Sequence, residues 1–204
     1  MKSFEEICCD VVKQPKFIKN ATIGLILGLI PIVNFFAFGY LVEMGKQSTK
    51  SGDLSLPDWP CVKGNFKNTL IENFSLGAIA FFEFILIPCL LGFSLFGLVG
   101  LEIFGICVGL FISAPAFAYA TVSDSLKIPW NAFAIFTDFS RVYKWVLAHY
   151  KKLAIPSALF LCFQVVISFV MPYTLMGAPI FLGLLFMVSY VKQMSKQNDN
   201  SSEL

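Results

Sequence analysis

Polar side chains within long apolar runs are the residues of this sequence most able to do chemistry: Glu83, Glu102, Asn34 and Gln164. A charged Asp at the centre of a membrane helix costs roughly 2.5–3.5 kcal/mol on insertion scales, so such residues usually form ion, proton or substrate sites. Glu83 lies ten residues into its apolar run, and Glu102 lies near the start of the next one. The first hypothesis is therefore a proton or substrate site at Glu83 that faces the protein interior. The second, which we favour, is a protonated Glu83 that hydrogen-bonds Asn34, Gln164 or a backbone carbonyl freed by a proline.

The cysteines and the histidine form no catalytic or metal-binding pattern. No pair of cysteines has CxxC spacing, and three of them lie in apolar runs: Cys8, Cys9, Cys61, Cys89, Cys107 and Cys162. We expect free thiols that pack as small apolar groups. His149 is the only histidine, which leaves little for a metal site or a catalytic triad. The sequence predicts no enzyme, no metal and no cofactor.

The elements that carry these residues are long enough to cross a membrane. Phe74–Ala120 contains only two charges in 47 residues, whereas roughly 18 apolar residues are enough for one transmembrane helix. We therefore predict two helices, Phe74–Leu95 and Val99–Ala120, with a turn between them. Leu153–Met171 and Gly177–Val191 predict a second such pair.

The composition agrees with this pattern, because 57% of the residues are hydrophobic and 23 are Phe. The predicted fold is an all-α, polytopic membrane helix bundle. Residues 1–192 form a single integral membrane domain, and residues 193–204 form a polar, disordered tail.

The first apolar run, Ala21–Val42, is interrupted by Pro31 and Asn34. It is either a proline-kinked span or a re-entrant hairpin that turns at these two residues. Each leg of a hairpin would have about ten residues and reach about 15 Å, which is half of the hydrocarbon core. We favour the re-entrant hairpin, because all 15 basic residues would then lie on one side of the membrane.

Two amphipathic segments are predicted to lie as helices at the membrane interface. The first covers residues 3–19, begins with a Ser3 and Glu6 capping box and is kinked or ended by Pro15. The second covers residues 131–152 and has an aromatic face. Interfacial side chains are expected to anchor the protein at the headgroups: Trp59, Trp130, Trp145, Lys144, Lys151 and Lys152.

Basic residues set the predicted topology, because lysine and arginine collect on the cytoplasmic side. The loops at 43–73 and 121–152 and the C-terminus carry eleven of the 15 basic residues. We expect an integral protein of the cell (inner) membrane with most charged loops in the cytoplasm. A weak internal repeat, in which Phe36–Gln47 aligns with Phe186–Gln197, also predicts that both halves end on the same side.

Short motifs give this chain a resemblance to a known family. These are Gly39-Tyr40, Gly52, Leu56-Pro57-Asp58-Trp59, Pro115-Ala-Phe-Ala-Tyr119 and Ala132-Phe133. The chain resembles the uncharacterised prokaryotic multi-pass membrane family catalogued as domain of unknown function 4013. Members often have acidic residues after the tryptophan, where this chain has Pro60 and Cys61. The resemblance implies a multi-pass membrane protein and brings no activity with it.

These observations favour a non-catalytic membrane component that binds partners. The alternative is a small transporter or channel-like protein that uses Glu83. A lipid-modifying enzyme would need a nucleophile–base pair or metal ligands, for which the sequence shows no arrangement. The expected partners are the lipid bilayer and other membrane protein subunits. Nucleic acid is not expected, since the net charge is only +2.

Overall fold

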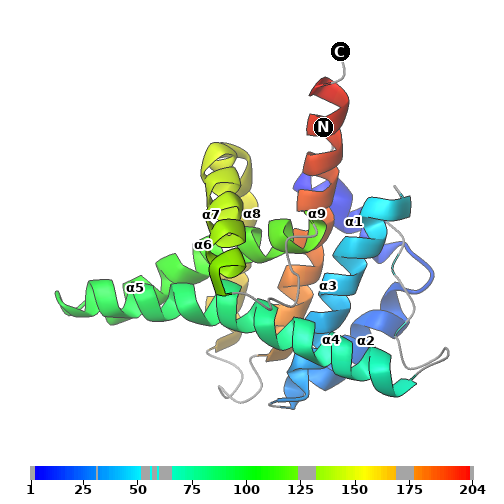
Figure 1. Cartoon of the computed structure of the whole chain (residues 1–204), viewed down its shortest axis with the longest axis horizontal. Helices are drawn as coiled ribbons and strands as arrows, with labels where there is room; N and C mark the ends of the chain where they lie inside the picture. The colour runs from blue at the N-terminus through cyan, green and yellow to red at the C-terminus, as the bar shows by residue number, and fades with distance from the viewer. Residues whose placement is uncertain are drawn as a thin grey trace.

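A computed structural model describes residues 3–30, 32–51, 56, 59, 66–123, 132–168 and 177–202. Within these residues the regular structure is entirely helical, which confirms the all-α prediction (Figure 1). The helices are α1 (Phe4–Val12), α2 (Phe17–Leu29), α3 (Asn34–Ser51), α4 (Phe66–Phe81), the π-helix η2 (Phe82–Leu86), α5 (Ile87–Gly97), α6 (Glu102–Val122), α7 (Ala132–Ala148), α8 (Tyr150–Ser168) and α9 (Gly177–Ser202).

Among the described residues, four helices are long and apolar enough to cross a membrane, which fits a membrane protein. They are Ile71–Gly97, Glu102–Val122, Tyr150–Ile167 and Gly177–Ser195. The first of these joins α4, η2 and α5 into one continuous helix, and α6 returns beside it. Figure 1 shows this hairpin projecting beyond the other helices on one side.

Close backbone contact holds α5 and α6 together. A Cβ atom on Gly92 would overlap the carbonyl oxygen of Gly105, and a Cβ atom on Gly105 would overlap that of Gly92. Gly109 lies one turn further along α6, where a Cβ atom would stand 2.7 Å from the Pro88 carbonyl oxygen. Small residues at four-residue spacing allow such close packing between apolar helices, which the hydrophobic effect does not hold together in lipid.

The first apolar run folds as two helices rather than as one kinked helix. α2 ends at Leu29, α3 begins at Asn34, and Ile32 between them has a positive φ of 72°. α2 is shorter than the four span-length helices. The break between the two helices is therefore present at the position predicted from Pro31 and Asn34. That this segment re-enters a bilayer stays a prediction.

Helix α1 buries part of its apolar face within the protein. The predicted capping box is present, since the Glu6 amide donates to Ser3 Oγ at 3.2 Å and the Ser3 amide donates to Glu6 Oε2 at 2.8 Å. The helix ends at Val12, before Pro15. Ile7 and Val11 are buried, and α1 packs on α9. Helix α9 therefore covers part of this apolar face, and the position of α1 at a membrane interface stays a prediction.

Helix α7 also packs on other helices with part of the face that the sequence predicts at a lipid interface. Val142 and Val146 are buried, and the Trp145 ring stacks on Tyr119 of α6 with centroids 4.0 Å apart. Phe139 packs against Phe84 of η2 at 6.0 Å. Protein rather than lipid covers this part of the predicted interfacial face. The segment also divides, because α7 ends at Ala148 and α8 begins at Tyr150.

Helix α9 lies at the centre and packs on α6, α2 and α3. It continues to Ser202, whereas the sequence predicts a disordered tail from residue 193. Met194 is buried, so packing extends past the predicted domain boundary at residue 192. Adding a residue to an existing helix avoids the cost of nucleation, and no Gly or Pro interrupts residues 192–202.

The two halves of the predicted repeat have related contacts. Tyr40 of α3 accepts a hydrogen bond from Asn20 Nδ2, in the first turn of α2, at 3.0 Å. Tyr190 of α9 donates to the carbonyl oxygen of Lys152, in the first turn of α8, at 3.2 Å. Both aligned tyrosines thus bond the helix before their own. At the offset of 150 residues, however, Lys152 aligns with residue 2 rather than with Asn20, so the repeat stays a prediction.

Candidate functional site

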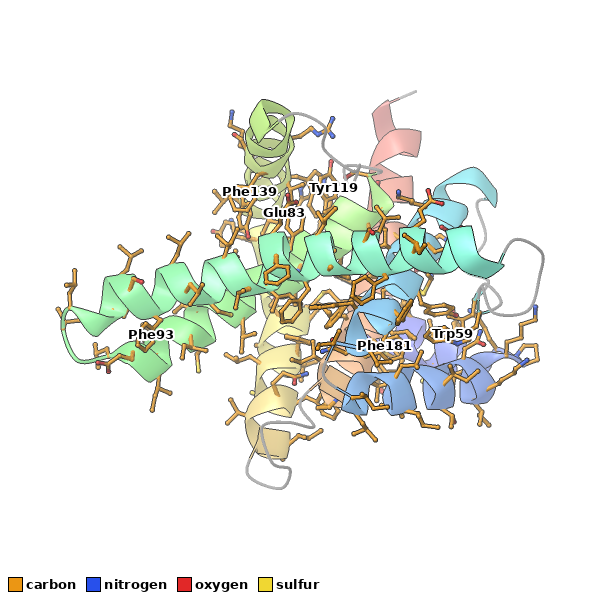
Figure 2. The ribbon with its side chains drawn as sticks, turned by 60° about the horizontal axis from the view of Figure 1, so that its bottom comes forward. Trp59, Glu83, Phe93, Tyr119, Phe139 and Phe181 are labelled. Atoms are coloured by element: carbon orange, nitrogen blue, oxygen red, sulfur yellow. The ribbon has the colours of Figure 1, made fainter. Side chains whose placement is uncertain are left out.

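Glu83 lies in the π-helix η2, near the middle of the long apolar helix. The π-helical turn closes with a bond from the Ile87 amide to the Phe82 carbonyl oxygen. Pro88 follows directly, and its missing N–H interrupts the regular ladder, which gives a local physical reason for the wider turn. In Figure 2, Glu83 is labelled on the same side of this helix as Tyr119 and Phe139.

Asn34 and Gln164 meet at the first turns of α9. Gln164 is buried, and its Nε2 donates to the Pro179 carbonyl oxygen at 3.1 Å. The Asn34 Nδ2 atom lies 3.2 Å from where a Cβ atom on Gly177 would stand. Asn34 Oδ1 and Gln164 Oε1 are buried and accept no hydrogen bond from the described residues. Gln164 thus bonds the start of α9, and the Asn34 side chain lies beside it.

This placement bears on the predicted partners of Glu83. Gln164 Nε2 bonds the Pro179 carbonyl oxygen, so among the described contacts of Gln164 it does not point to Glu83, and the partner of Glu83 stays a prediction. A carbonyl freed by Pro88 stays as the predicted alternative.

Glu102 occupies a different place from the other candidates. It is the first residue of α6, at the turn of the projecting hairpin, and is partly exposed. A carboxylate in the first turn of a helix interacts favourably with the helix dipole and the unpaired N–H groups. The four polar candidates therefore occupy three separate places: Glu83 in η2, Glu102 at the hairpin turn, and Asn34 with Gln164 beside α9.

Trp59 belongs to the core rather than to a membrane interface. It is only 5% exposed, and its Nε1 atom donates to the Asn20 carbonyl oxygen at 3.3 Å. Its ring also lies 6.4 Å from that of Phe181 in α9 (Figure 2). The anchor prediction for Trp59 is therefore wrong in the structure. No pattern in the sequence indicated the buried Asn20, which links Trp59 to Tyr40.

The other predicted anchors have mixed outcomes. Lys144, Lys151 and Lys152 are exposed, as anchors should be. Trp145 is half-buried between the rings of Tyr119 and His149. Trp130 lies outside the described residues.

His149 and the described cysteines form no metal site. The His149 Nδ1 atom lies 2.9 Å from the Trp145 carbonyl oxygen and therefore donates to it, since a carbonyl only accepts. Cys8, Cys9, Cys89, Cys107 and Cys162 are free thiols. Among the described residues, no group of three His, Cys, Asp or Glu side chains could hold a metal ion.

Comparison with known proteins adds no further assignment: no family model, curated protein or solved structure matches this chain.

Proposed function

We propose that this chain is a non-catalytic integral membrane protein that acts as a membrane-embedded binding component. The observation that carries this proposal is the projecting hairpin of α5 and α6. Large apolar side chains are exposed on both of its helices and at its turn: Leu90, Leu91, Phe93, Leu95, Leu98, Val99, Leu101, Ile103 and Phe104. Burying apolar surface is worth roughly 25 cal/mol per Å², so a bilayer or an apolar partner is the favourable surrounding for this hairpin.

The placement of the polar residues supports a binding role over a catalytic one. Glu83, Glu102 and Gln164 lie on different elements and in different places. General acid–base or nucleophilic chemistry needs groups within hydrogen-bond reach of each other and of the substrate.

The resemblance to the domain of unknown function 4013 family, the cell (inner) membrane location and the cytoplasmic position of the charged loops are parts of the same proposal. The lipid bilayer and other membrane protein subunits are its proposed partners, and nucleic acid is not.

Proton flux in reconstituted vesicles tests this proposal against the transporter alternative. With a pH gradient across the membrane, vesicles that contain the wild-type protein should leak protons no faster than vesicles without protein. A protein-dependent flux that Glu83→Gln abolishes would overturn the proposal. The matched control is Glu102→Gln, which changes a carboxylate outside the middle of the helix.

One observation favours the transporter as the second candidate. Single π-helical turns occur often at functional sites, and η2 contains Glu83. Pro88 gives η2 a structural origin that needs no substrate, so we place this candidate second.

A further inference from the structure

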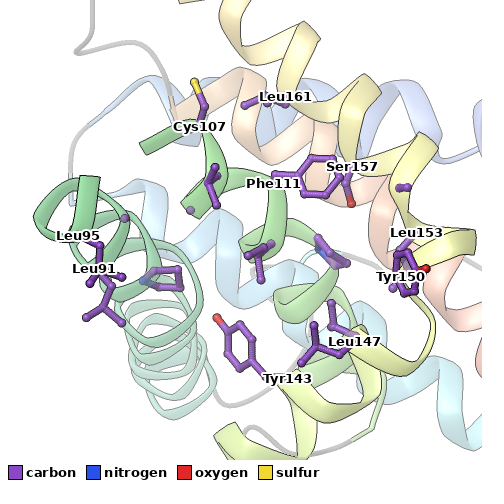
Figure 3. A pocket seen from close by; sticks show the side chains of 18 of the residues that line it. Leu91, Leu95, Cys107, Phe111, Tyr143, Leu147, Tyr150, Leu153, Ser157 and Leu161 are labelled. Carbon is purple, nitrogen blue, oxygen red and sulfur yellow. The ribbon is translucent and has the colours of Figure 1, made fainter. Parts of the chain in front are cut away.

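A large apolar cavity lies between the hairpin and the two helices that follow it. Its volume is about 810 Å³, within the range of about 300–1,000 Å³ typical of small-molecule sites. Four helices line it, with Leu91 on α5, Ile112 on α6, Leu147 on α7 and Leu161 on α8 among the lining residues (Figure 3). The occupant of such a cavity must be mainly hydrocarbon.

Two buried hydroxyls in the cavity wall lack partners. Within the described residues, Tyr143 OH and Ser157 Oγ are the buried hydroxyls that make no hydrogen bond. Figure 3 shows the Tyr143 ring pointing its hydroxyl into the cavity from α7, while Ser157 lies on the wall formed by α8. Ser157 is only 1% exposed. Leaving a buried hydroxyl unpaired is unfavourable, so an occupant with hydrogen-bond acceptors would stabilise both groups.

The Tyr143 hydroxyl can donate throughout the neutral pH range. Burial raises the pKa of Tyr143 above the ordinary value of a tyrosine, with Cys89 as a lesser cause. The phenol therefore stays protonated.

The mouth of the cavity opens on the exposed apolar surface of the hairpin. Leu95 and Phe104 line the cavity and are also exposed, by 67% and 54%. Leu147 on the opposite wall is exposed by 69%. A hydrocarbon chain could thus enter sideways from the surface that we propose is in the bilayer.

Exposed basic residues are neighbours in sequence of the lining residues where α7 meets α8. Lys144 follows the lining residue Tyr143 directly, and Lys151 and Lys152 lie between the lining residues Tyr150 and Leu153. All three lysines are exposed, and residues 139–168 contain no Asp or Glu. Each basic residue near an anionic membrane surface is worth about 1 kcal/mol, so this rim favours a negative headgroup.

We infer that the cavity binds one anionic glycerophospholipid, with an acyl chain between the hairpin and α8 and its ester oxygens accepting hydrogen bonds from Tyr143 and Ser157. The lysines at the α7–α8 junction hold the phosphate. This inference rests on the proposed membrane function, because the cavity must face lipid. An ester-linked anionic lipid matches three features of the site. Its hydrocarbon fits the apolar walls, its ester oxygens can accept from the hydroxyls, and its phosphate carries the charge opposite to that of the lysines.

A phosphatidylglycerol with a photoactivatable group in its acyl chain tests the inference. The full chain, reconstituted in bilayers of phosphatidylcholine with a trace of this probe, is irradiated, and the cross-linked peptides are mapped. We expect cross-links to concentrate on the cavity walls, including Ile112 and Leu161. Excess unlabelled phosphatidylglycerol should compete better than phosphatidylcholine, and high salt should reduce that preference.

Variants separate the hydroxyls from the apolar walls. Tyr143→Phe with Ser157→Ala should weaken retention of phosphatidylglycerol in native mass spectrometry at least about fivefold, since two hydrogen bonds are lost. Ser140→Ala is the control, because Ser140 is exposed on α7 and is not among the residues that line the cavity. It should bind like the wild type. Ala154→Phe should reduce retention by filling the cavity.

Two results would overturn the inference. The first is equal cross-linking over the outer hairpin and the cavity, unchanged in the double variant, which would mean unspecific annular lipid. The second is full retention in the double variant, which would mean that Ser157 bonds a carbonyl of its own helix and needs no ligand. Either result would leave the proposed membrane function standing, whereas a proton flux that needs Glu83 would end that proposal without involving this cavity.

Discussion

Tyr40 and Trp59 lie ring on ring, with centroids 4.1 Å apart and planes 12° from parallel. Asn20 joins them, because its side chain donates to the Tyr40 hydroxyl while its carbonyl accepts from Trp59. This cluster connects the start of α2 to α3 and to the Trp59 segment. It explains why Trp59 is buried although indole rings are common at membrane interfaces.

Removing Trp59 should therefore destabilise the fold. We expect Trp59→Ala to cost about 3–5 kcal/mol of unfolding free energy, as for a buried aromatic residue. Trp59→Phe should cost only about 0.5–1.5 kcal/mol, since it removes mainly the hydrogen bond. Unfolding in mild detergent measures both. Trp145→Ala is the control at a half-buried tryptophan, and an equal loss there would contradict the core position of Trp59.

Because α5 and α6 pack closely, adding one methyl group at their contact should destabilise the fold. Gly92→Ala places its Cβ atom against the Gly105 carbonyl, so we expect a loss of about 1–3 kcal/mol. Gly97→Ala is the matched control on the same helix, because its Cβ atom would make an ordinary 3.5 Å contact with Glu102. Thermal unfolding of the two variants measures this loss, and only Gly92→Ala should lower the melting temperature. Similar melting temperatures would mean that α5 and α6 are further apart.

The reactivity of Cys8 should depend steeply on pH. Burial, and to a lesser extent the neighbouring Cys9, raises the pKa of Cys8 to about 11, so little reactive thiolate exists at pH 8. With the other cysteines replaced by alanine, alkylation by a maleimide should rise about tenfold per pH unit between pH 8 and 10. In the unfolded chain, the rate should level off above the ordinary thiol pKa of about 8.5. The same levelling in the folded protein would show that α1 does not bury Cys8.

Two truncations locate the end of the packed part of α9. A chain that stops after Ser195 keeps the buried Lys192 and Met194, and we expect nearly wild-type stability. A chain that stops after Val191 loses Met194 and should lose about 2–5 kcal/mol. Equal melting temperatures for the two truncations would support the sequence-based boundary at residue 193 instead.

Hydropathy and local signals predicted much of this fold, because each depends on a short stretch of chain. The run of apolar residues around Glu83 predicted the hairpin, and Ser3 with Glu6 predicted the cap of α1. Pro31 and Asn34 located the break before α3. These features need no knowledge of what lies nearby in space.

Contacts between distant segments were the part that the sequence did not reveal. An apolar face that packs on protein and one that packs on lipid have the same residue types. The apolar faces of α1 and α7 and the ring of Trp59 were therefore predicted at the interface, whereas protein covers part of each helix face and buries Trp59. The hydrogen-bond partner of Gln164 is the Pro179 carbonyl at the start of α9, and composition cannot indicate such a pairing. The aromatic pattern included Tyr143, but no pattern indicated Ser157, whose role comes only from the cavity.

The depth of the hairpin in a bilayer tests the central claim most directly. A fluorescent label attached to Cys at position 95 or 103, where Leu and Ile are 67% and 79% exposed, reports the surroundings of α5 and α6. In reconstituted vesicles we predict quenching by spin-labelled lipids and protection from aqueous iodide at both positions. Labels at Lys144→Cys and Lys151→Cys should show the reverse preference. Iodide quenching at positions 95 and 103 as strong as at the two lysine positions would contradict a membrane-embedded hairpin.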